Sequence, residues 1–334
     1  MHRRGNLQMI AALVAAGVTG GGQWDRLAAP SVDAGVVAAH EQVMRALAGT
    51  YITGDPRAML PAAAGFADGL APLLKRAPTH ELGLRLATVA VDAHSMAGIM
   101  AFHAGDPVLT QRHLAQAGHV ADTSTDPLLR ARAWAMLAHY VHSPLWDGHG
   151  SSRRAVVLVG RARALARHAD GHTREYLGAG LAEEAAEAGD VALCEWALED
   201  AGRALDTATG HDGGLFSPAG LYGDVRIWLG GMSRCVTGLA GRLDEAERAI
   251  GGEIAAAQNA RQHVNALCAL GAVRVKDAQP EGACAALREA VDLALATANR
   301  AKLPRAGAVR LKMPPTWDPL GCVTDLDEQL RLVA

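Results

Sequence analysis

Histidines are the most concentrated chemically active side chains in this sequence. Seven of the fourteen fall within a window of 56 residues, namely His94, His103, His113, His119, His139, His142 and His149. His139 and His142 are three residues apart, so on a helix they would share one face. Neutral imidazole is a good nitrogen ligand for zinc and related metals, and Asp106, Asp122 or Asp147 could complete such a site. Metal binding is therefore one hypothesis for this chain.

Two other interpretations of the histidine cluster compete with metal binding. Long polar faces of alanine-rich helices often carry histidine as packed or surface residues. Imidazole also titrates near neutral pH, which would suit a pH-responsive or ligand-lining surface. The chain contains no His-Glu-x-x-His motif, and no cysteine lies within the histidine-rich window. We therefore assign no metal ligand from the sequence and expect no cofactor.

Aromatic residues gather in the same part of the chain. Phe102, Trp134, Tyr140 and Trp146 are four of the thirteen aromatic residues. They would form either the apolar wall of a peptide or small-molecule pocket, or a core between adjacent helical hairpins. Both can hold, because the inner helices of a repeat stack also line its groove. The residues that we predict to line a ligand or partner groove are His103, Trp134, Tyr140, His142, Trp146 and Arg154.

A basic stretch between residues 153 and 174 offers a possible anion site. Arg154, Arg161 and His168 are spaced by seven residues and would align along one helix. Such a stripe could hold phosphate or an acidic partner segment, although it is more often a solvated helix face. The net charge of −3 argues against a dedicated nucleic-acid binder. Phosphate-loop, dinucleotide-binding and serine-elbow motifs are absent, so we assign no catalytic residue.

A recurring turn signature predicts the elements that would position these side chains. It reads Phe-His-Ala-Gly-Asp at 102–106, Glu-Ala-Gly-Asp at 187–190 and Leu-Ala-Gly-Arg at 239–242, with a looser copy at 275–277. Alanines follow each copy at positions typical of a closely packed helix. Each copy therefore predicts a helix that ends at a short turn and a second helix that packs back on the first.

Composition predicts an all-α protein, because half of the chain is apolar and alanine, the best helix former, dominates. We predict helices over about 33–51, 57–75, 79–104, 106–122, 126–141, 152–169 and 173–188. Asp106, Asp126 and Thr173 are the expected caps of three of them. Turn glycines at 105, 148, 189 and 241 are separated by 43, 41 and 52 residues, and the last interval contains an expected insertion at 209–223. The predicted fold is an irregular tetratricopeptide-like helical-hairpin solenoid over 31–334, capped by N-terminal helices in 1–30.

The N-terminal segment and the cysteines bear on the compartment. Arg3-Arg4 precedes an apolar stretch from Met9 to Val18, which resembles a secretory or twin-arginine signal. The stretch is too short to cross a membrane, so we favour a packed first helix. The five cysteines are scattered and form no Cys-x-x-Cys pair, which is typical of small buried residues in a reducing compartment. We therefore predict a cytoplasmic protein.

Four further stretches, spread over nearly the whole chain, share a pattern with a known family. They are Arg3-Arg4 with Trp24-Asp25-Arg26-Leu27, the segment 97–106, the segment 213–218 with Gly241-Arg242-Leu243-Asp244-Glu245-Ala246, and the closing segment 315–330. Together they resemble the C-terminal tetratricopeptide-like region of actinobacterial transcriptional regulators of the Cro/repressor helix-turn-helix class. The resemblance implies a repeat fold and a sensing or scaffolding role, and it supplies no catalytic residues. The DNA-binding domain of that family has no counterpart in this sequence, so the resemblance puts DNA binding by this chain in doubt.

The sequence therefore favours a non-enzymatic interaction or ligand-sensing protein, an accessory or orphan regulator. Its partner would be a protein, a peptide or a small signalling molecule bound in a concave groove. Nucleic acid and membrane partners are not expected, and a homodimer is left open. The alternative is an enzyme built on a recruited repeat scaffold, metal-dependent through the cluster from His94 to His149.

Overall fold

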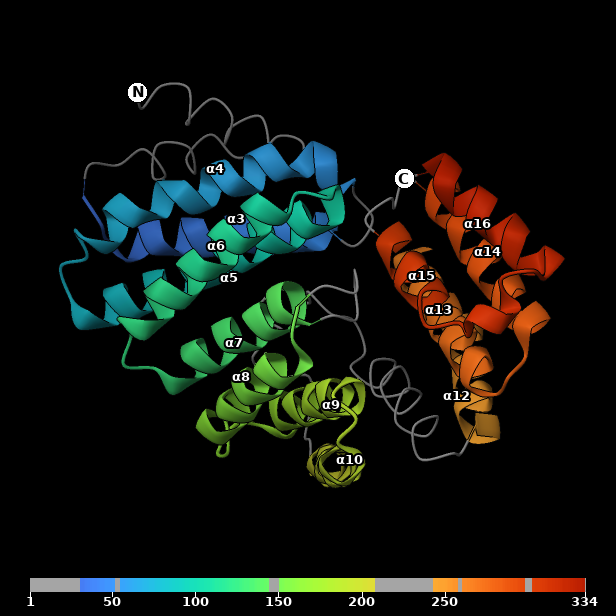
Figure 1. Ribbon diagram of the computed structural model, residues 1–334. Coiled ribbons are helices and arrows are strands. Elements are labelled where there is room, and N and C mark those ends of the chain that lie inside the picture. The colour runs from blue at the N-terminus through green and yellow to red at the C-terminus, as the bar shows by residue number, and fades with distance from the viewer. Residues whose placement is uncertain are drawn as a thin grey trace. The chain divides into compact units, whose positions relative to one another are not determined.

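The computed structural model describes residues 31–51, 55–143, 150–207, 243–257, 260–297 and 302–333. Within these ranges the chain is helical and contains no strand, which confirms the all-α prediction (Figure 1). The predicted N-terminal element at 1–30 and the predicted insertion at 209–223 lie outside the described residues. None of the described helices is long and apolar enough to span a membrane.

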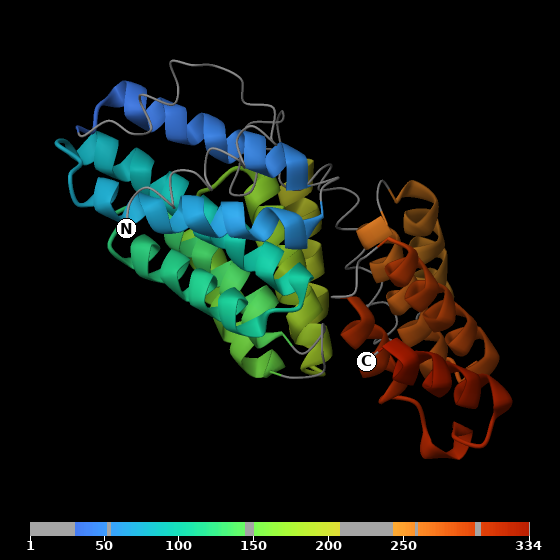
Figure 2. The ribbon, with the colours of Figure 1, turned by 90° about the horizontal axis from the view of Figure 1, so that it is seen from above.

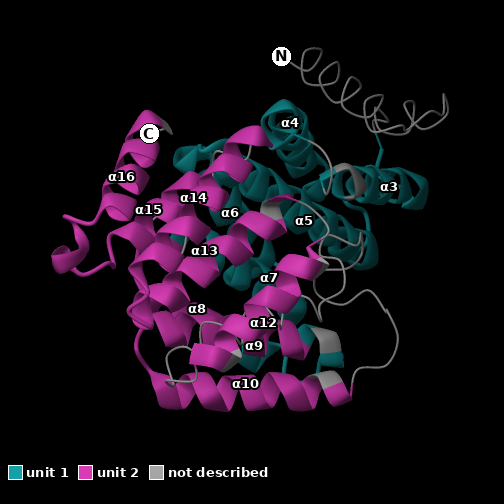
Figure 3. Cartoon of the chain, turned by 90° about the vertical axis from the view of Figure 1, so that its right-hand side faces the viewer, with its two compact units in different colours: residues 1–141, 161–173, 209–222 teal, residues 142–160, 174–208, 223–334 magenta. Residues whose placement is uncertain are grey.

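The chain divides into two compact units (Figure 3). The first comprises residues 1–141, 161–173 and 209–222, and the second comprises 142–160, 174–208 and 223–334. Helices α8 (Ser152–Leu165) and α9 (Gly171–Glu187) contribute residues to both units. We describe each unit by itself.

The first unit is built around one long helix. Its elements are α3 (Ala34–Tyr51), α4 (Pro56–Leu74), α5 (His80–Ala104), α6 (Pro107–Asp122) and α7 (Pro127–Leu137), followed by the π-helical turn η1 (Ala138–His142), whose last residue belongs to the second unit. Helix α5 packs against α3, α4, α6 and α7. Because it has neighbours around most of its circumference, almost every side chain from Leu86 to Ala101 is buried. Side chains on α5 can therefore meet groups from several other helices.

Short polar caps set where these helices begin. The carboxylates of Asp55, Asp106 and Asp126 accept hydrogen bonds from the first-turn amides of α4, α6 and α7. A proline follows each aspartate at the first helical position, where its missing N–H costs no hydrogen bond. The caps predicted at Asp106 and Asp126 are confirmed.

Two local predictions were wrong. The expected cap at Thr173 is instead inside α9, and the Asp170 carboxylate accepts the hydrogen bond from the Thr173 amide at 2.9 Å. The helix expected to continue to Val141 leaves the α-helical path at Leu137. The π-helical turn that follows carries both His139 and His142, and its wider winding changes the angle between side chains three residues apart.

The second unit contains α10 (Val191–Asp206), α12 (Leu243–Ala256), α13 (Ala260–Lys276), α14 (Pro280–Ala296), α15 (Leu303–Arg310), the short 3₁₀ turn η3 (Pro315–Trp317) and α16 (Gly321–Val333). The last four α-helices surround one apolar core, and Figure 2 shows α13 to α16 from a second direction. Four cysteines, Cys194, Cys268, Cys284 and Cys322, form no disulfide bond, and the first three are buried, as predicted for small apolar residues. Cys235 lies outside the described residues.

Three helical hairpins, α5/α6, α9/α10 and α13/α14, share one turn geometry. Each first helix is followed by a residue in the left-handed region, Gly105 at φ 79°, Gly189 at φ 78° or Ala278 at φ 54°. The next amide in each turn donates to the carbonyl five residues earlier, at 2.9 Å in all three hairpins. This bond satisfies a carbonyl that the helix end leaves open. The turns predicted at 105 and 189 and near 277 are confirmed, whereas Gly241 lies outside the described residues.

Packing between the two helices of each hairpin also follows a common register, which we call the hairpin frame. Gly98, Ala182 and Gly271 each lie seven residues before the left-handed position. A Cβ atom at Gly98 would lie 2.7 Å from Leu114 Cγ, and one at Gly271 would lie 2.8 Å from Leu287 Cδ2. The two leucines are each sixteen residues after their glycine. In α9/α10, Cys194 lies twelve residues after Ala182, and its thiol donates to the carbonyl of Ala182 at 2.8 Å. Small residues thus let each pair of helices approach closely.

Candidate metal centre

The residues predicted to line a groove lie at several places. His103 is buried at the end of α5, where its ring centroid lies 5.9 Å from that of Tyr51 and 6.4 Å from that of Tyr140. Phe102 packs edge-on against both His103 and Tyr140, with centroid distances of 5.3 and 5.2 Å. The structure therefore brings together His103 and Tyr140 in an aromatic cluster of the first unit.

The remaining predicted groove residues are Trp134, His142, Trp146 and Arg154. Trp134 is half-buried on α7, and Trp146 lies outside the described residues. In the second unit His142 is half-buried, and burial together with the positive charge of Arg154 lowers its pKa. Arg154 and Arg161 are exposed on α8, and His168 is exposed just after its end, which fits the solvated-face interpretation of the basic stretch.

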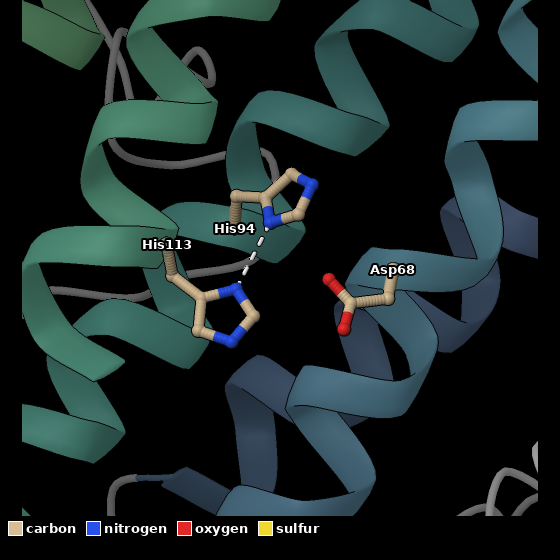
Figure 4. A group of neighbouring side chains, drawn as sticks. All are labelled: Asp68, His94 and His113. Carbon is tan, nitrogen blue, oxygen red and sulfur yellow. Dashed lines mark hydrogen bonds between the residues drawn. The ribbon is translucent and has the colours of Figure 1, made fainter. Parts of the chain in front are cut away.

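One group of potential metal ligands stands out among the described residues. Asp68 on α4, His94 on α5 and His113 on α6 each place a ligand atom within 4.8 Å of the others. We call these three residues the His–His–Asp cluster. Figure 4 shows the Asp68 carboxylate directed toward the two imidazole rings. Three successive helices of the first unit thus contribute one donor each.

The two imidazoles face each other at close range. Nδ1 of His94 lies 3.1 Å from Nδ1 of His113, and the ring centroids are 5.3 Å apart. Without a metal, this contact requires one ring to donate its Nδ1 proton and the other to accept it. His113 Nε2 is buried without a hydrogen-bond partner among the described residues. The histidine pair therefore leaves hydrogen-bonding capacity unused inside the bundle.

The same spacing fits two nitrogen ligands on one metal ion. Nitrogen atoms bound to a tetrahedral zinc ion at about 2.05 Å are roughly 3.3 Å apart. The observed separation of 3.1 Å between the Nδ1 atoms needs only a small adjustment to reach that value. Two imidazoles and one carboxylate form a donor set that zinc and ferrous iron use in proteins. The cluster would leave at least one coordination position for water or another ligand.

Burial places both imidazoles in the protonation state that binds metals. His94 is 3 % exposed and His113 is fully buried. Burial, with smaller contributions from the neighbouring His113 and Arg112, lowers the pKa of His94 to about 4, whereas Asp68 opposes the change. Burial also lowers the pKa of His113. The rings are therefore neutral at neutral pH, so no proton has to leave a charged imidazolium before a metal binds.

The hairpin frame shows that histidine is unusual at these two positions. His94 lies four residues before Gly98, and His113 lies fifteen residues after it. The corresponding pair is Leu267 and Ala286 in α13/α14, both buried. In α9/α10 it is Gly178 and Ala197. Two of the three hairpins thus fill this contact between helices with apolar or small residues, and only α5/α6 fills it with two imidazoles.

Asp68 completes the cluster from the outer side. Its side chain is 46 % exposed, and its Oδ2 accepts a hydrogen bond from an Arg112 guanidinium nitrogen at 2.8 Å. Arg112 precedes His113 on α6, so a positive charge lies beside the cluster. A metal ion would have to share or take over the carboxylate that Arg112 now contacts.

Sequence reasoning found two of these three residues but not their pairing. His94 and His113 belong to the histidine-rich window, yet their separation of 19 residues gives no local signal. Asp68 lies 26 residues before His94 and outside that window. Alignment of the hairpins on their left-handed turn residues would have revealed the anomalous His–His pair.

Comparison with known proteins gives no family for this chain: no protein-family model matches it, and it matches no curated protein.

Proposed function

We propose that this chain is a non-enzymatic helical-repeat sensor whose ligand is a divalent transition-metal ion, held by the His–His–Asp cluster. The observation that carries the proposal is the close pairing of two buried, neutral imidazoles at a frame position that is apolar or small in the other two hairpins. Zinc and its first-row neighbours suit these donors better than magnesium or calcium, which prefer oxygen ligands.

The proposal also includes the finer architecture. The three hairpins with a common frame support a tetratricopeptide-like arrangement, in line with the resemblance to the sensing region of Cro/repressor-type regulators. In that arrangement the protein would act as an accessory or orphan regulator, and metal binding would fasten α4, α5 and α6 together. A peptide or protein partner would then meet a more rigid first unit in the metal-loaded state.

The test is metal binding by the untagged full chain, measured by isothermal titration calorimetry with Zn²⁺. We expect one zinc ion per chain and an increase in thermal stability with zinc concentration, because a ligand bound only by the folded state stabilises it. Substitution with Co²⁺ gives an independent readout, since its visible absorption reports nitrogen and oxygen coordination.

The hairpin frame itself supplies a conservative variant. His94→Leu/His113→Ala introduces the residues that α13/α14 carries at the same positions, so the fold should be retained. This variant should lose the zinc site. The matched control is His119→Ala, which removes an exposed histidine from α6 and should leave binding unchanged. Zinc binding by the double variant with the same stoichiometry and affinity as the unmodified chain would refute the proposal.

A second candidate function is metal-dependent catalysis, which is favoured because the cluster offers only three protein ligands. Three protein ligands leave a coordination position at which zinc can activate a water molecule. The discriminating assay compares hydrolysis of an activated ester by the zinc-loaded chain and by the zinc-treated double variant. Zinc-dependent turnover only in the unmodified chain would favour the enzyme, and equal background rates would favour the sensor.

A further inference from the structure

We propose that Arg112 is a resident competitor for the metal, and that metal binding exchanges the guanidinium for the ion at the Asp68 carboxylate. This inference rests on the proposed metal site and concerns its regulation. It assigns Arg112 the role of setting the affinity of the site, although Arg112 contributes no donor atom.

The first observation is the position of the ion pair. Arg112 Nη2 lies 2.8 Å from Asp68 Oδ2, so the only carboxylate of the His–His–Asp cluster already has a cationic partner. The pair joins α4 to α6, the two helices that a metal ion would also join through Asp68 and His113. The Arg112 guanidinium and a bound metal ion would therefore both use the Asp68 carboxylate, and either one would link α4 to α6.

The second observation is exposure. The side chains of Arg112 and Asp68 are 58 % and 46 % exposed, whereas the two imidazoles are buried. Exposed ion pairs contribute little to stability because water solvates the separated charges well. The guanidinium can therefore leave the carboxylate at small cost, while the imidazoles stay in place as the fixed part of the site.

The third observation is the local charge. Arg112 is the residue next to His113, and its positive charge acts on both imidazoles, so it also opposes the binding of a divalent ion at the cluster. When the metal binds, the Arg112 side chain leaves Asp68 and moves into solvent, which lowers the repulsion between the guanidinium and the ion. The Arg112 guanidinium on α6 is then unpaired and solvated only in the metal-loaded state. The exchange thus changes the charge pattern of the α4–α6 surface.

The test uses Arg112→Gln in the full chain, with zinc affinity measured by calorimetry. We expect tighter binding, by up to about fivefold, if the variant removes the competition of an exposed ion pair. The control is Arg85→Gln, which removes the same charge from another half-exposed ion pair between helices of the first unit, Arg85 with Glu41 at 2.9 Å. Zinc affinity of this control should match that of the unmodified chain.

A double-mutant cycle with Asp68→Asn separates exchange from a general charge effect. In the Asp68→Asn background the gain from Arg112→Gln should be smaller, because the carboxylate for which the two cations compete is gone and only the repulsion between the Arg112 charge and the zinc ion remains. An undiminished gain in that background would overturn the exchange, as would zinc binding that Arg112→Gln leaves unchanged or weakens. Absence of zinc binding in every variant, including the unmodified chain, would instead remove the metal site together with this inference.

Discussion

Close packing at Gly98 yields a prediction that links the hairpin frame to the metal centre. A Cβ atom at this position would lie 2.7 Å from Leu114 Cγ and 2.8 Å from its Cδ2. Both distances are far below a normal carbon–carbon contact, and Leu114 is fully buried, so Gly98→Ala has to displace the Leu114 side chain or move α5 and α6 apart. Overpacking of this kind costs about 1–3 kcal/mol, and the better helix propensity of alanine returns up to about 1 kcal/mol. We expect a net loss of roughly 1–2 kcal/mol.

Gly65→Ala is the matched control, because a Cβ atom at Gly65 on α4 meets nothing within 4 Å. This variant should be stabilised by about 0.5–1 kcal/mol through helix propensity alone. Hydrogen exchange of the α5 and α6 amides measures the opening free energy of the first unit separately from that of the second. Zinc affinity should fall only in Gly98→Ala, because His94 lies one turn away on the same helix and would move away from His113.

The opposite result has a clear meaning. Equal exchange protection in Gly98→Ala and Gly65→Ala would show that the two helices can absorb the extra methyl group without separation. The close approach would then not hold His94 against His113. A double variant with Leu114→Ala checks the cause, because its destabilisation should be smaller than the sum of the two single effects.

Two further predictions concern buried charges. Asp92 on α5 pairs with Arg132 on α7 in a buried ion pair, so Asp92→Ala, which leaves the guanidinium without its partner, should lower the free energy of unfolding by about 3–5 kcal/mol in urea denaturation. The single variant Asp92→Ala should lose more unfolding free energy than the double variant Asp92→Ala/Arg132→Met, which removes both charges. An equal or smaller loss in the single variant would contradict this prediction. Burial, together with the nearby Glu183 charge, raises the pKa of Glu184 on α9 to about 9, compared with about 4.5 for a glutamate in the unfolded chain. The folded state therefore holds the Glu184 proton more tightly than the unfolded chain, and the resulting stabilisation is fully present below pH 4.5. Between these values stability should fall by up to about 1.4 kcal/mol per pH unit as the pH rises, and urea denaturation of Glu184→Gln at pH 5 to 8 should show a flatter dependence; an unchanged slope would refute the assignment.

Elements with local signals could be predicted from the sequence. Asp106 followed by proline begins α6, and Gly105 ends α5, because caps and left-handed turns depend on a few neighbouring residues. The cap predicted at Thr173 was wrong because Asp170, three residues earlier, takes the capping position: its carboxylate accepts from the Thr173 amide, and α9 begins before Thr173. The π-helical turn after α7 also escaped prediction, because nothing in the residues 138–142 departs from an ordinary helical pattern.

The candidate site could be predicted only in part, for a physical reason. Histidine enrichment included two residues of the candidate cluster, but the cluster combines single residues from α4, α5 and α6 that only tertiary packing brings together. The glycine at position 98 controls how closely α5 and α6 approach, and its role depends on a leucine in the next helix. The aromatic contact between His103 and Tyr140 likewise depends on packing between distant segments.

The hairpin frame has a consequence for how new binding sites could arise in this molecule. The backbone of α13/α14 already holds positions 267 and 286 in the register that His94 and His113 occupy in α5/α6. Two substitutions, Leu267→His and Ala286→His, would therefore transplant the imidazole pair into another hairpin without redesign of a turn or a helix. The residues at this contact can thus change from apolar to imidazole within the same backbone register, so the side chains of one hairpin can be altered independently of the other hairpins.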